Sequence, residues 1–379
     1  MALPKSLGDS NASAEQLVRE SQLLSDPYGI PTLKIQPAQF GDIAKDEEVL
    51  KATLRDTIQE FFKDAAKGDA QRQAQMNAIV FNGGNFADNK QYLLTRTAMS
   101  ALDENYGDAH ALCVREDKGE PLAGVIIMPR AERSFGTNAE NATGVSASQF
   151  APPTVPVAQL SFMTIWHEYA HAAGADEAQA DKMAAIMARK AFPSSNVLQV
   201  YADLRIIDSL LDYNSQPREF TNKKGEKETI PARHEIYGWR MAEAVDEVAA
   251  MPQEKIHAMD EKTIRKITEA EIGHPKYDAL RRVGDTLTAR HPELFEYKKA
   301  NLKEISAALQ TLLKNGTFDN DPDALAIASR SLLAISRVAL DGPKLEADIA
   351  AKSRFATPKL KAEIPVSMNR QPNLKPPSL

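Results

Sequence analysis

Apolar residues recur at helical spacing along most of the chain from residue 157 onward. In Val197–Tyr213, the residues Val200, Leu204, Ile207 and Leu211 fall on one face of a 3.6-residue repeat, which predicts a buried helix. A chain with this pattern is expected to be mainly helical. The same spacing predicts four more helices, over Arg233–Met251, Ile264–Ile272, Leu302–Leu313 and Ala324–Leu340.

Other short segments have the apolar, β-branched character of strands. His110–Arg115 and Ala123–Met128 flank the polar turn Glu116–Pro121, and this arrangement predicts a β-hairpin. Ala78–Phe81, which is followed by Asn-Gly-Gly, predicts a third strand. The predicted fold class is therefore α+β and mainly helical, with a small antiparallel sheet.

Three stretches lack regular apolar spacing. Residues 1–40 are interrupted by prolines and are expected to be flexible, and the polar stretch Arg130–Pro156 is expected to be a loop that borders a cleft. Residues 351–379 contain five prolines and six basic residues against one acid, so we expect a disordered tail. A frayed terminus explains this tail more simply than a docking peptide or a secretion signal. Between these stretches we expect a core over residues 41–250 and a helical region over residues 251–350.

The composition is that of a globular protein. Hydrophobic residues make up 43% of the 379 residues, which excludes disorder over most of the length. The net charge is −6 and the basic residues are dispersed, so nucleic acid is not an expected partner. No apolar window is long enough to cross a bilayer and no secretory signal is recognisable, so we expect a cytoplasmic protein that does not contact membranes. Cys113, the single cysteine, excludes an internal disulfide and a thiolate metal cluster.

The chemistry of the chain is concentrated in the run His167–His171, which reads His-Glu-Tyr-Ala-His. Its flanks are apolar and it follows a proline-rich stretch, so we expect it to lie on a buried helix. Residues four apart share a helix face, so His167 and His171 can each offer a ring nitrogen to one zinc ion. Glu168 is the candidate general base, because a carboxylate beside the metal can accept a proton from a zinc-activated water.

The residues after this run supply a candidate third ligand. Gly174 can take the positive φ that ends a helix and turns the chain back towards the metal. Glu177 is the preferred ligand, because a carboxylate completes a His₂Glu site with an open position for water. If Asp176 is the N-cap of the next helix, Asp181 shares a face with Glu177 and can orient a ligand histidine. Two alternatives stay open: Asp176 or Asp181 binds the metal directly, or these acids only complement the positive N-terminus of the helix.

The His-Glu-x-x-His run resembles the signature of the zincin metallopeptidases. The pair Glu177 and Asp181 resembles the Glu-x-x-x-Asp element of gluzincins, whereas the short spacing past Gly174 is similar to the loop of metzincins. The same residues also resemble those of poorly characterised bacterial metallopeptidases. The resemblance covers only His167–Asp181. It implies that residues 41–250 form a zincin-like core, in which an upstream sheet supports the active-site helix and its edge strand pairs with a substrate peptide.

The same resemblance implies a downstream side chain that stabilises the oxyanion of the reaction. His234 and Tyr237, three residues apart on a predicted helix, are the candidates. The simpler interpretation, which we favour, is a half-buried pair beside Trp239 in the core.

Together these features predict a zinc-dependent hydrolase, most simply a metallopeptidase that cleaves a peptide bond in a protein or peptide substrate. Two other classes of protein are compatible with the sequence. One is a regulatory or scaffold protein whose zinc is not catalytic, and the other is a helical interaction protein in which the motif is accidental.

Overall fold

The computed structural model describes most of the chain between residues 28 and 340. The statements below concern residues 28–82, 97–98, 101–102, 109–116, 119–128, 135–143, 145–213, 218–221, 227–230, 237–270, 277–295 and 301–340. The predicted tail over residues 351–379 and residues 1–27 of the N-terminal segment lie outside the described residues.

The N-terminal half of the described chain contains a three-stranded sheet. Strand β3 (Ala123–Ile127) is central, and it pairs antiparallel with β2 (His110–Val114) and parallel with β1 (Thr32–Ile35). The predicted hairpin is confirmed, but the prediction of a purely antiparallel sheet is wrong because β1 makes it mixed. The third strand comes from residues that we expected to be flexible. It is only four residues long and its partner is distant in sequence, so no local pattern marks it.

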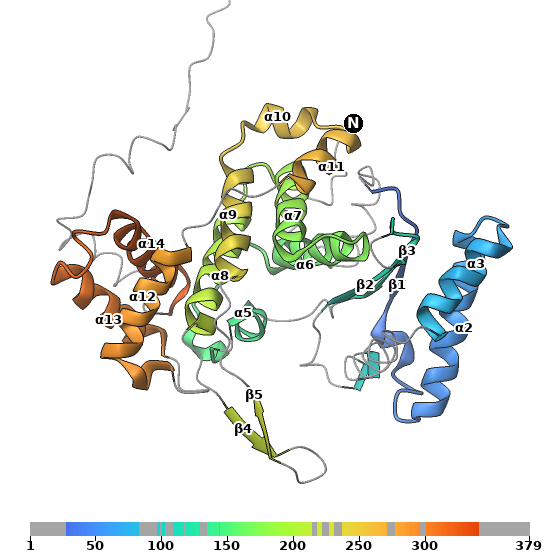
Figure 1. The fold of residues 1–379 in the computed structure, drawn as a ribbon, viewed down its shortest axis with the longest axis horizontal. Helices are drawn as coiled ribbons and strands as arrows, with labels where there is room; N and C mark the ends of the chain where they lie inside the picture. Colours follow the sequence, from blue (N-terminus) through green and yellow to red (C-terminus); the bar gives the residue numbers. More distant parts are fainter. Residues whose placement is uncertain are drawn as a thin grey trace, which may run out of the picture.

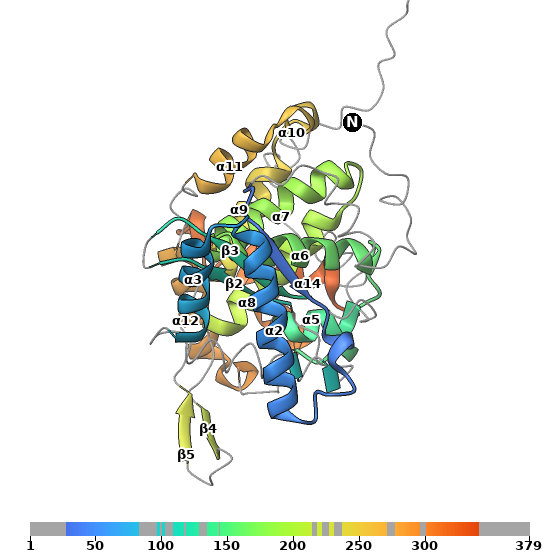
Figure 2. The same ribbon diagram turned by 90° about the vertical axis from the view of Figure 1, so that its right-hand side faces the viewer.

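Both faces of the sheet are covered, because alternate residues of a strand point to opposite faces. Val125 and Ile127 of β3 belong to the hydrophobic cluster that includes α2 (Glu47–Ala65), whereas Ile126 packs with α6 (Val157–Ala172). Figure 2 shows α2 and α3 (Ala70–Asn77) in front of the sheet, with α6 behind it. The sheet is therefore a buried layer that supports α6.

The sheet approaches the end of α6 at a glycine. A Cβ at Gly124 would lie 2.6 Å from the Cβ of Ala172 and 3.0 Å from its carbonyl oxygen. Any larger side chain at this position would push β3 away from α6. Gly124 therefore allows the close contact that holds the C-terminal end of α6 in place.

Two predictions for the N-terminal half are wrong. Ala78–Phe81 is not a strand but lies in a π-helical segment (Ala78–Asn82) that directly follows α3. The helix that begins at the N-cap Asp69 continues into these residues instead of ending at Asn77. The stretch Arg130–Pro156 is not one loop: it contains α5 (Phe135–Thr143) and a short 3₁₀ helix (Ala147–Gln149). Phe135 and Phe150 pack edge to face there, which gives this polar stretch an apolar anchor.

Each of the five segments that the spacing predicts as helical after residue 157 overlaps a helix, whereas the helices Gln253–Ala258 and Tyr277–Arg290 were not predicted. The centre of the molecule consists of α6, α7 (Glu177–Ala191), α8 (Val197–Tyr213) and α9 (Tyr237–Ala249). A small hairpin, β4 (Arg218–Thr221) and β5 (Lys227–Ile230), connects α8 to α9. The mainly helical α+β fold class is confirmed.

The remaining helices pack on this centre. These are α10 (Gln253–Ala258), α11 (Glu261–Glu269), α12 (Tyr277–Arg290), α13 (Leu302–Lys314) and α14 (Pro322–Val338), with a 3₁₀ turn over Pro292–Phe295. Figure 1 shows α12–α14 at one end of the molecule and the sheet near the other, with α6–α9 between them. One hydrophobic cluster continues from α5 to α14, across the boundary that we expected at residue 250. In this described part of the chain, none of the helices has both the length and the apolar character needed to cross a membrane.

Candidate metal centre

Helix α6 places two histidines on the face that points towards α7. His167 and His171 lie one turn apart, with ring centroids 4.5 Å apart and ring planes at 88°. Their Nε2 atoms are 2.9 Å apart, and His167 is buried whereas the side chain of His171 is 20% exposed. The opposite side of α6 carries Ile165 and Ala172, which pack against the sheet. The apolar contact with the sheet therefore determines which way the histidines face.

The end of α6 is a sharp turn that fixes the ring of His171. Gly174 has φ +92°, its N–H bonds the carbonyl of His171, and the N–H of Ala175 bonds the carbonyl of Ala170. These two bonds form a Schellman motif, which a glycine at this position favours. The carbonyl of Ala175 then accepts a hydrogen bond from Nδ1 of His171 at 2.9 Å. The predicted helix end at Gly174 is confirmed.

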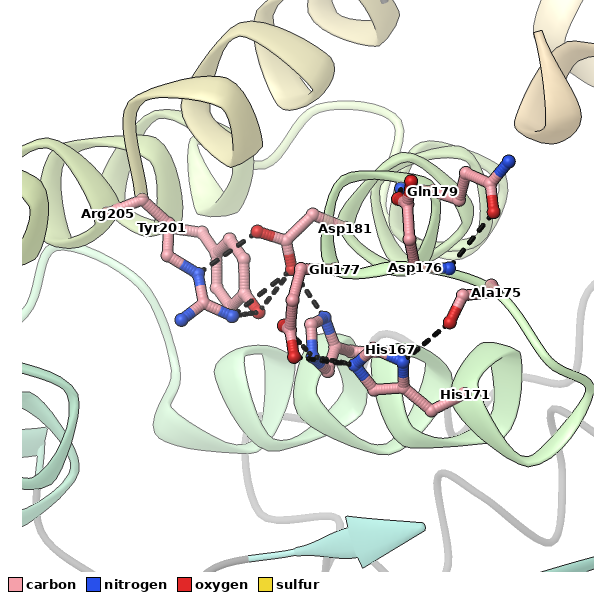
Figure 3. A network of polar contacts seen from close by, with 9 residues as sticks. All are labelled: His167, His171, Ala175, Asp176, Glu177, Gln179, Asp181, Tyr201 and Arg205. Atoms are coloured by element: carbon pink, nitrogen blue, oxygen red, sulfur yellow. Dashed lines mark hydrogen bonds and ion pairs between the residues drawn. The ribbon is translucent and has the colours of Figure 1, made fainter. Parts of the chain in front are cut away.

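Helix α7 begins immediately after this turn. Asp176 is its N-cap: the Asp176 carboxylate accepts from the N–H of Gln179, and the Gln179 side chain accepts from the N–H of Asp176. This capping box confirms the predicted N-cap and fixes the direction in which α7 leaves the turn. Glu177, the first residue of α7, has its two carboxylate oxygens 3.3 Å from Nε2 of His167 and of His171 (Figure 3).

The other two acids considered as ligands point elsewhere. The carboxylate of Asp176 is engaged in the capping box and lies 3.4 Å from Nη2 of Arg240. The carboxylate of Asp181, one turn beyond Glu177 on α7, lies 2.6 Å from Nδ1 of His167. This is the side of the imidazole opposite to Nε2, the nitrogen that faces Glu177. Among the described residues, the group of possible metal ligands here is His167, His171 and Glu177.

The hydrogen bonds of the two imidazoles leave three acceptors facing one another. The Ala175 carbonyl and an ionised Asp181 can only accept, so each histidine donates from Nδ1 and presents the lone pair of Nε2. The ionised carboxylate of Glu177 is the third acceptor. Acceptors at this spacing repel one another unless positive charge lies between them, so the geometry favours a bound cation.

A proton is one cation that the group attracts. Burial by itself lowers the pKa of His167, but the charge and hydrogen bond of Asp181 reverse this effect and raise the pKa to about 9. Hydrogen bonds with His167 and His171 hold the pKa of Glu177 well below its usual range. The pKa shifts of His167 and Glu177 and the arrangement of the three acceptors therefore both indicate a group that attracts positive charge.

A metal ion is the other cation that the group can hold. One atom from each of His167, His171 and Glu177 lies within 4.8 Å of the other two. Tetrahedral zinc ligands at about 2.0–2.1 Å from the metal are about 3.3 Å apart. The Nε2 atoms of His167 and His171 lie at this distance from Oε2 and Oε1 of Glu177 respectively, and the separation of the two Nε2 atoms, 2.9 Å, is slightly shorter. Two imidazoles and one carboxylate are also a donor set that suits zinc.

Glu168 lies beside this group and is half-buried. Burial raises the pKa of its carboxyl group, and the nearby charges of His167 and His171 oppose that rise. Among the described residues, none donates a hydrogen bond to the Glu168 carboxylate. The carboxylate of Glu168 therefore lies within the electrostatic influence of both histidines.

The two downstream candidates are not placed by the structure. His234 lies outside the described residues, and for Tyr237 only the backbone, at the start of α9, is described. Their neighbour Trp239 is 4% exposed, and its Nε1 donates to Glu243 at 3.1 Å. The predicted place of Trp239 in the core is confirmed.

Sequence reasoning missed two residues near this group, Tyr201 and Arg205 on α8. Both contact the carboxylate of Asp181 (Figure 3). The available signal was that Tyr201 and Arg205 lie one turn apart on a helix whose apolar spacing predicts burial, which indicates a buried polar partner. The sequence does not say which partner, because α7 and α8 meet only in the folded chain.

Comparison of the chain with protein families, with curated proteins and with solved structures gives no match. The resemblance to zincins therefore depends on the residues His167–Asp181 and on the geometry of the three acceptors.

Proposed function

We propose that the protein is a zinc-dependent hydrolase, and more specifically a metallopeptidase. One observation carries the proposal: two imidazole nitrogens and a carboxylate oxygen converge from a helix–turn–helix, with Glu168 beside them. This is the donor set of a His₂Glu catalytic zinc site.

The residues divide into holding and proton-transferring groups. His167, His171 and Glu177 would each hold the metal through one atom. When bound, zinc supplies Lewis acidity, which makes water more acidic and a carbonyl carbon more electrophilic. The carboxylate of Glu168 takes the proton of the attacking water and returns it to the nitrogen of the leaving amine.

The number of protein ligands supports a catalytic site over a structural one. Structural zinc sites are almost always closed by four protein ligands, whereas catalytic sites use three and leave a position open. Within the part of the chain that the structure describes, no fourth histidine, cysteine or acid joins the group. A regulatory or scaffold role for the zinc is therefore the less favoured alternative.

A peptide bond as the target, and a protein or peptide as the substrate, is supported by the zincin resemblance of His167–Asp181 alone. In this proposal a bound metal would supply positive charge for the oxyanion, and the zincin resemblance makes His234 or Tyr237 the candidate for a further stabilising contact.

The first experiment measures the zinc content of the full-length protein by elemental analysis. We expect one zinc per chain in the native protein and none in His171→Ala, while His257→Ala, a change at an exposed histidine, keeps the metal. Native protein prepared with ample zinc that contains no metal would contradict the proposal.

The second experiment separates catalysis from metal binding. Glu168→Gln should keep the zinc and lose hydrolysis of a mixed peptide library, with a decrease of roughly 100-fold or more in rate. If Glu168→Gln retains both zinc and full hydrolysis, Glu168 is not the base. If the native zinc protein hydrolyses no peptide, the metal is not that of a peptidase.

A further inference from the structure

The carboxylate of Asp181 is completely buried and has three different partners. It accepts from Nδ1 of His167 at 2.6 Å, from the hydroxyl of Tyr201 at 2.9 Å and from Arg205, whose Nε and Nη2 lie 3.0 and 3.2 Å from its two oxygens. A buried carboxylate is costly unless it is paired and hydrogen-bonded. Arg205 supplies the opposite charge, and its side chain is only 19% exposed.

Tyr201 and Arg205 also contact each other, so the contacts form a closed ring. Nη2 of Arg205 donates to the hydroxyl of Tyr201 at 2.9 Å, and that hydroxyl donates to Oδ1 of Asp181. The guanidinium lies 5.0 Å from the centroid of the tyrosine ring, which limits its rotation. Figure 3 shows this closed set of contacts among Asp181, Tyr201 and Arg205, which lies on the side of the His167 imidazole that faces away from His171.

The ring of contacts removes the freedom of Asp181 to rotate. A carboxylate held by two arginine nitrogens keeps its plane, so the hydrogen bond to Nδ1 also fixes the plane of the imidazole. A fixed hydrogen bond to Nδ1 leaves Nε2 as the nitrogen that points at His171 and Glu177. The orientation of one candidate ligand on α6 therefore depends on two side chains of α8.

We propose that Arg205 and Tyr201 are positioning residues for the metal ligand His167, acting through Asp181, and that they set the affinity of the site for zinc. This inference rests on the proposed zinc site. Outer partners of a ligand histidine orient its ring and raise its basicity, and their loss typically weakens metal binding.

A purely structural role is the competing explanation, because Arg205 also ties α8 to α7. The chain offers a matched control for that role. Arg337 of α14 holds the buried carboxylate of Asp203 through two bonds of 2.7 Å, and neither residue contacts the metal group. Both pairs join α8 to a neighbouring helix, but only one pair includes a partner of His167.

The experiment compares Arg205→Gln with Arg337→Gln in the full-length chain. The zinc dissociation constant is measured by competition with a chromophoric chelator, and stability is measured by thermal unfolding in EDTA. We expect both variants to lose stability, and only Arg205→Gln to raise the zinc dissociation constant, by about 10- to 100-fold.

Two milder variants keep the test valid if Arg205→Gln does not fold. Arg205→Lys keeps the charge but not the paired geometry, so its zinc affinity should lie between those of the native chain and Arg205→Gln. Tyr201→Phe removes one hydroxyl and should weaken zinc binding by about 2- to 10-fold.

The outcomes separate this inference from the proposed function. Native protein that binds stoichiometric zinc, together with an unchanged dissociation constant in Arg205→Gln and Tyr201→Phe, would overturn the positioning role alone. Equal weakening by Arg337→Gln would also overturn it, since general destabilisation would then explain the loss. Native protein that binds no zinc would overturn both.

Discussion

Helix α8 takes part in two buried salt bridges whose carboxylates have different additional partners. Asp181 and Arg205 join α7 to α8, and Asp203 and Arg337 join α8 to α14. In each pair the carboxylate is completely buried and the arginine is held by two contacts. Asp203 has Gln199 of its own helix as an additional partner, whereas Asp181 has Tyr201 of α8 and His167 of the candidate metal group.

The additional partner changes the electrostatics of the carboxylate. Burial raises the pKa of both acids. At Asp181 the charge of Arg205 and the contact with His167 outweigh burial, so the pKa lies below its usual value. At Asp203 burial outweighs Arg337, so the pKa lies above it. The Asp203–Arg337 salt bridge thus only joins two helices, whereas the Asp181–Arg205 salt bridge joins two helices and also contacts a candidate metal ligand.

Breaking each pair at its acid is expected to give the largest effects. Asp181→Asn leaves the largely buried guanidinium of Arg205 without its counter-charge, which should lower the free energy of unfolding by about 3–5 kcal/mol. Asp203→Asn should lower it by less, because the raised pKa of Asp203 means that the folded chain accommodates a neutral side chain at this position. Urea unfolding in the presence of EDTA measures this loss without any contribution from bound metal. Zinc affinity should fall about 10- to 100-fold in Asp181→Asn and stay within about twofold in Asp203→Asn.

Equal zinc affinity in the two variants would remove the distinction between the pairs. The exposed acid Asp278, whose side chain is 85% exposed, offers a control substitution, and Asp278→Asn should change neither quantity.

Zinc itself should stabilise the chain by a somewhat smaller amount. A ligand that binds only the folded state at 100 to 1,000 times its dissociation constant stabilises by about 2.7–4.1 kcal/mol. Thermal unfolding with and without EDTA should therefore show a shift in the native chain and in Asp203→Asn, and none in His171→Ala. A shift of equal size in His171→Ala would place the bound metal outside the His167 group.

The helix–turn–helix of the candidate site could be predicted from the sequence because each of its steps is local. The spacing of His167 and His171, the turn at Gly174 and the N-cap at Asp176 all depend on residues within one or two turns. Glu177 reaches the histidines because these local choices leave α7 only one direction.

The features that the sequence analysis missed or predicted wrongly depend on contacts between residues that are distant in sequence. Strand β1 forms because β3, some ninety positions later, offers it an edge. Arg205 meets Asp181 only once α7 and α8 have packed together. Ala78–Phe81 has strand-like residues, yet it lies in a helical segment because α3 runs up to Asn77 and Val80 packs into the hydrophobic cluster between the sheet and α2.

The turn before α7 provides a smaller test, with a second glycine as a matched control. Gly174 and Gly68 have φ +92° and +87°, so the backbone strain of alanine at either position should cost about 1 kcal/mol in the free energy of unfolding, and at Gly174 the new Cβ would also lie 3.2 Å from Nη1 of Arg115. A Cβ at Gly68 meets no atom within 4 Å, and its turn joins α2 to α3, away from the metal group.

Only the turn at Gly174 positions the carbonyl of Ala175, which holds Nδ1 of His171. Gly174→Ala should therefore weaken zinc binding by roughly 10-fold, and Gly68→Ala should leave it unchanged. Chelator competition on both variants checks this. Unchanged zinc binding in Gly174→Ala would mean that His171 does not depend on the turn.

The smallest expected effect is a dependence on pH at Asp203. Because its pKa is raised in the folded protein, the folded state binds the proton more tightly than the unfolded state. The contribution of this group to stability is therefore fully present below the unfolded pKa, about 3.9, and declines as pH rises through the folded pKa. Asparagine does not titrate, so the stability difference between the native chain and Asp203→Asn should shrink with rising pH. Urea unfolding in EDTA from about pH 3.5 to 6.5 measures this change. If the difference grows with pH instead, Arg337 outweighs burial, and the two carboxylates on either side of α8 are electrostatically alike.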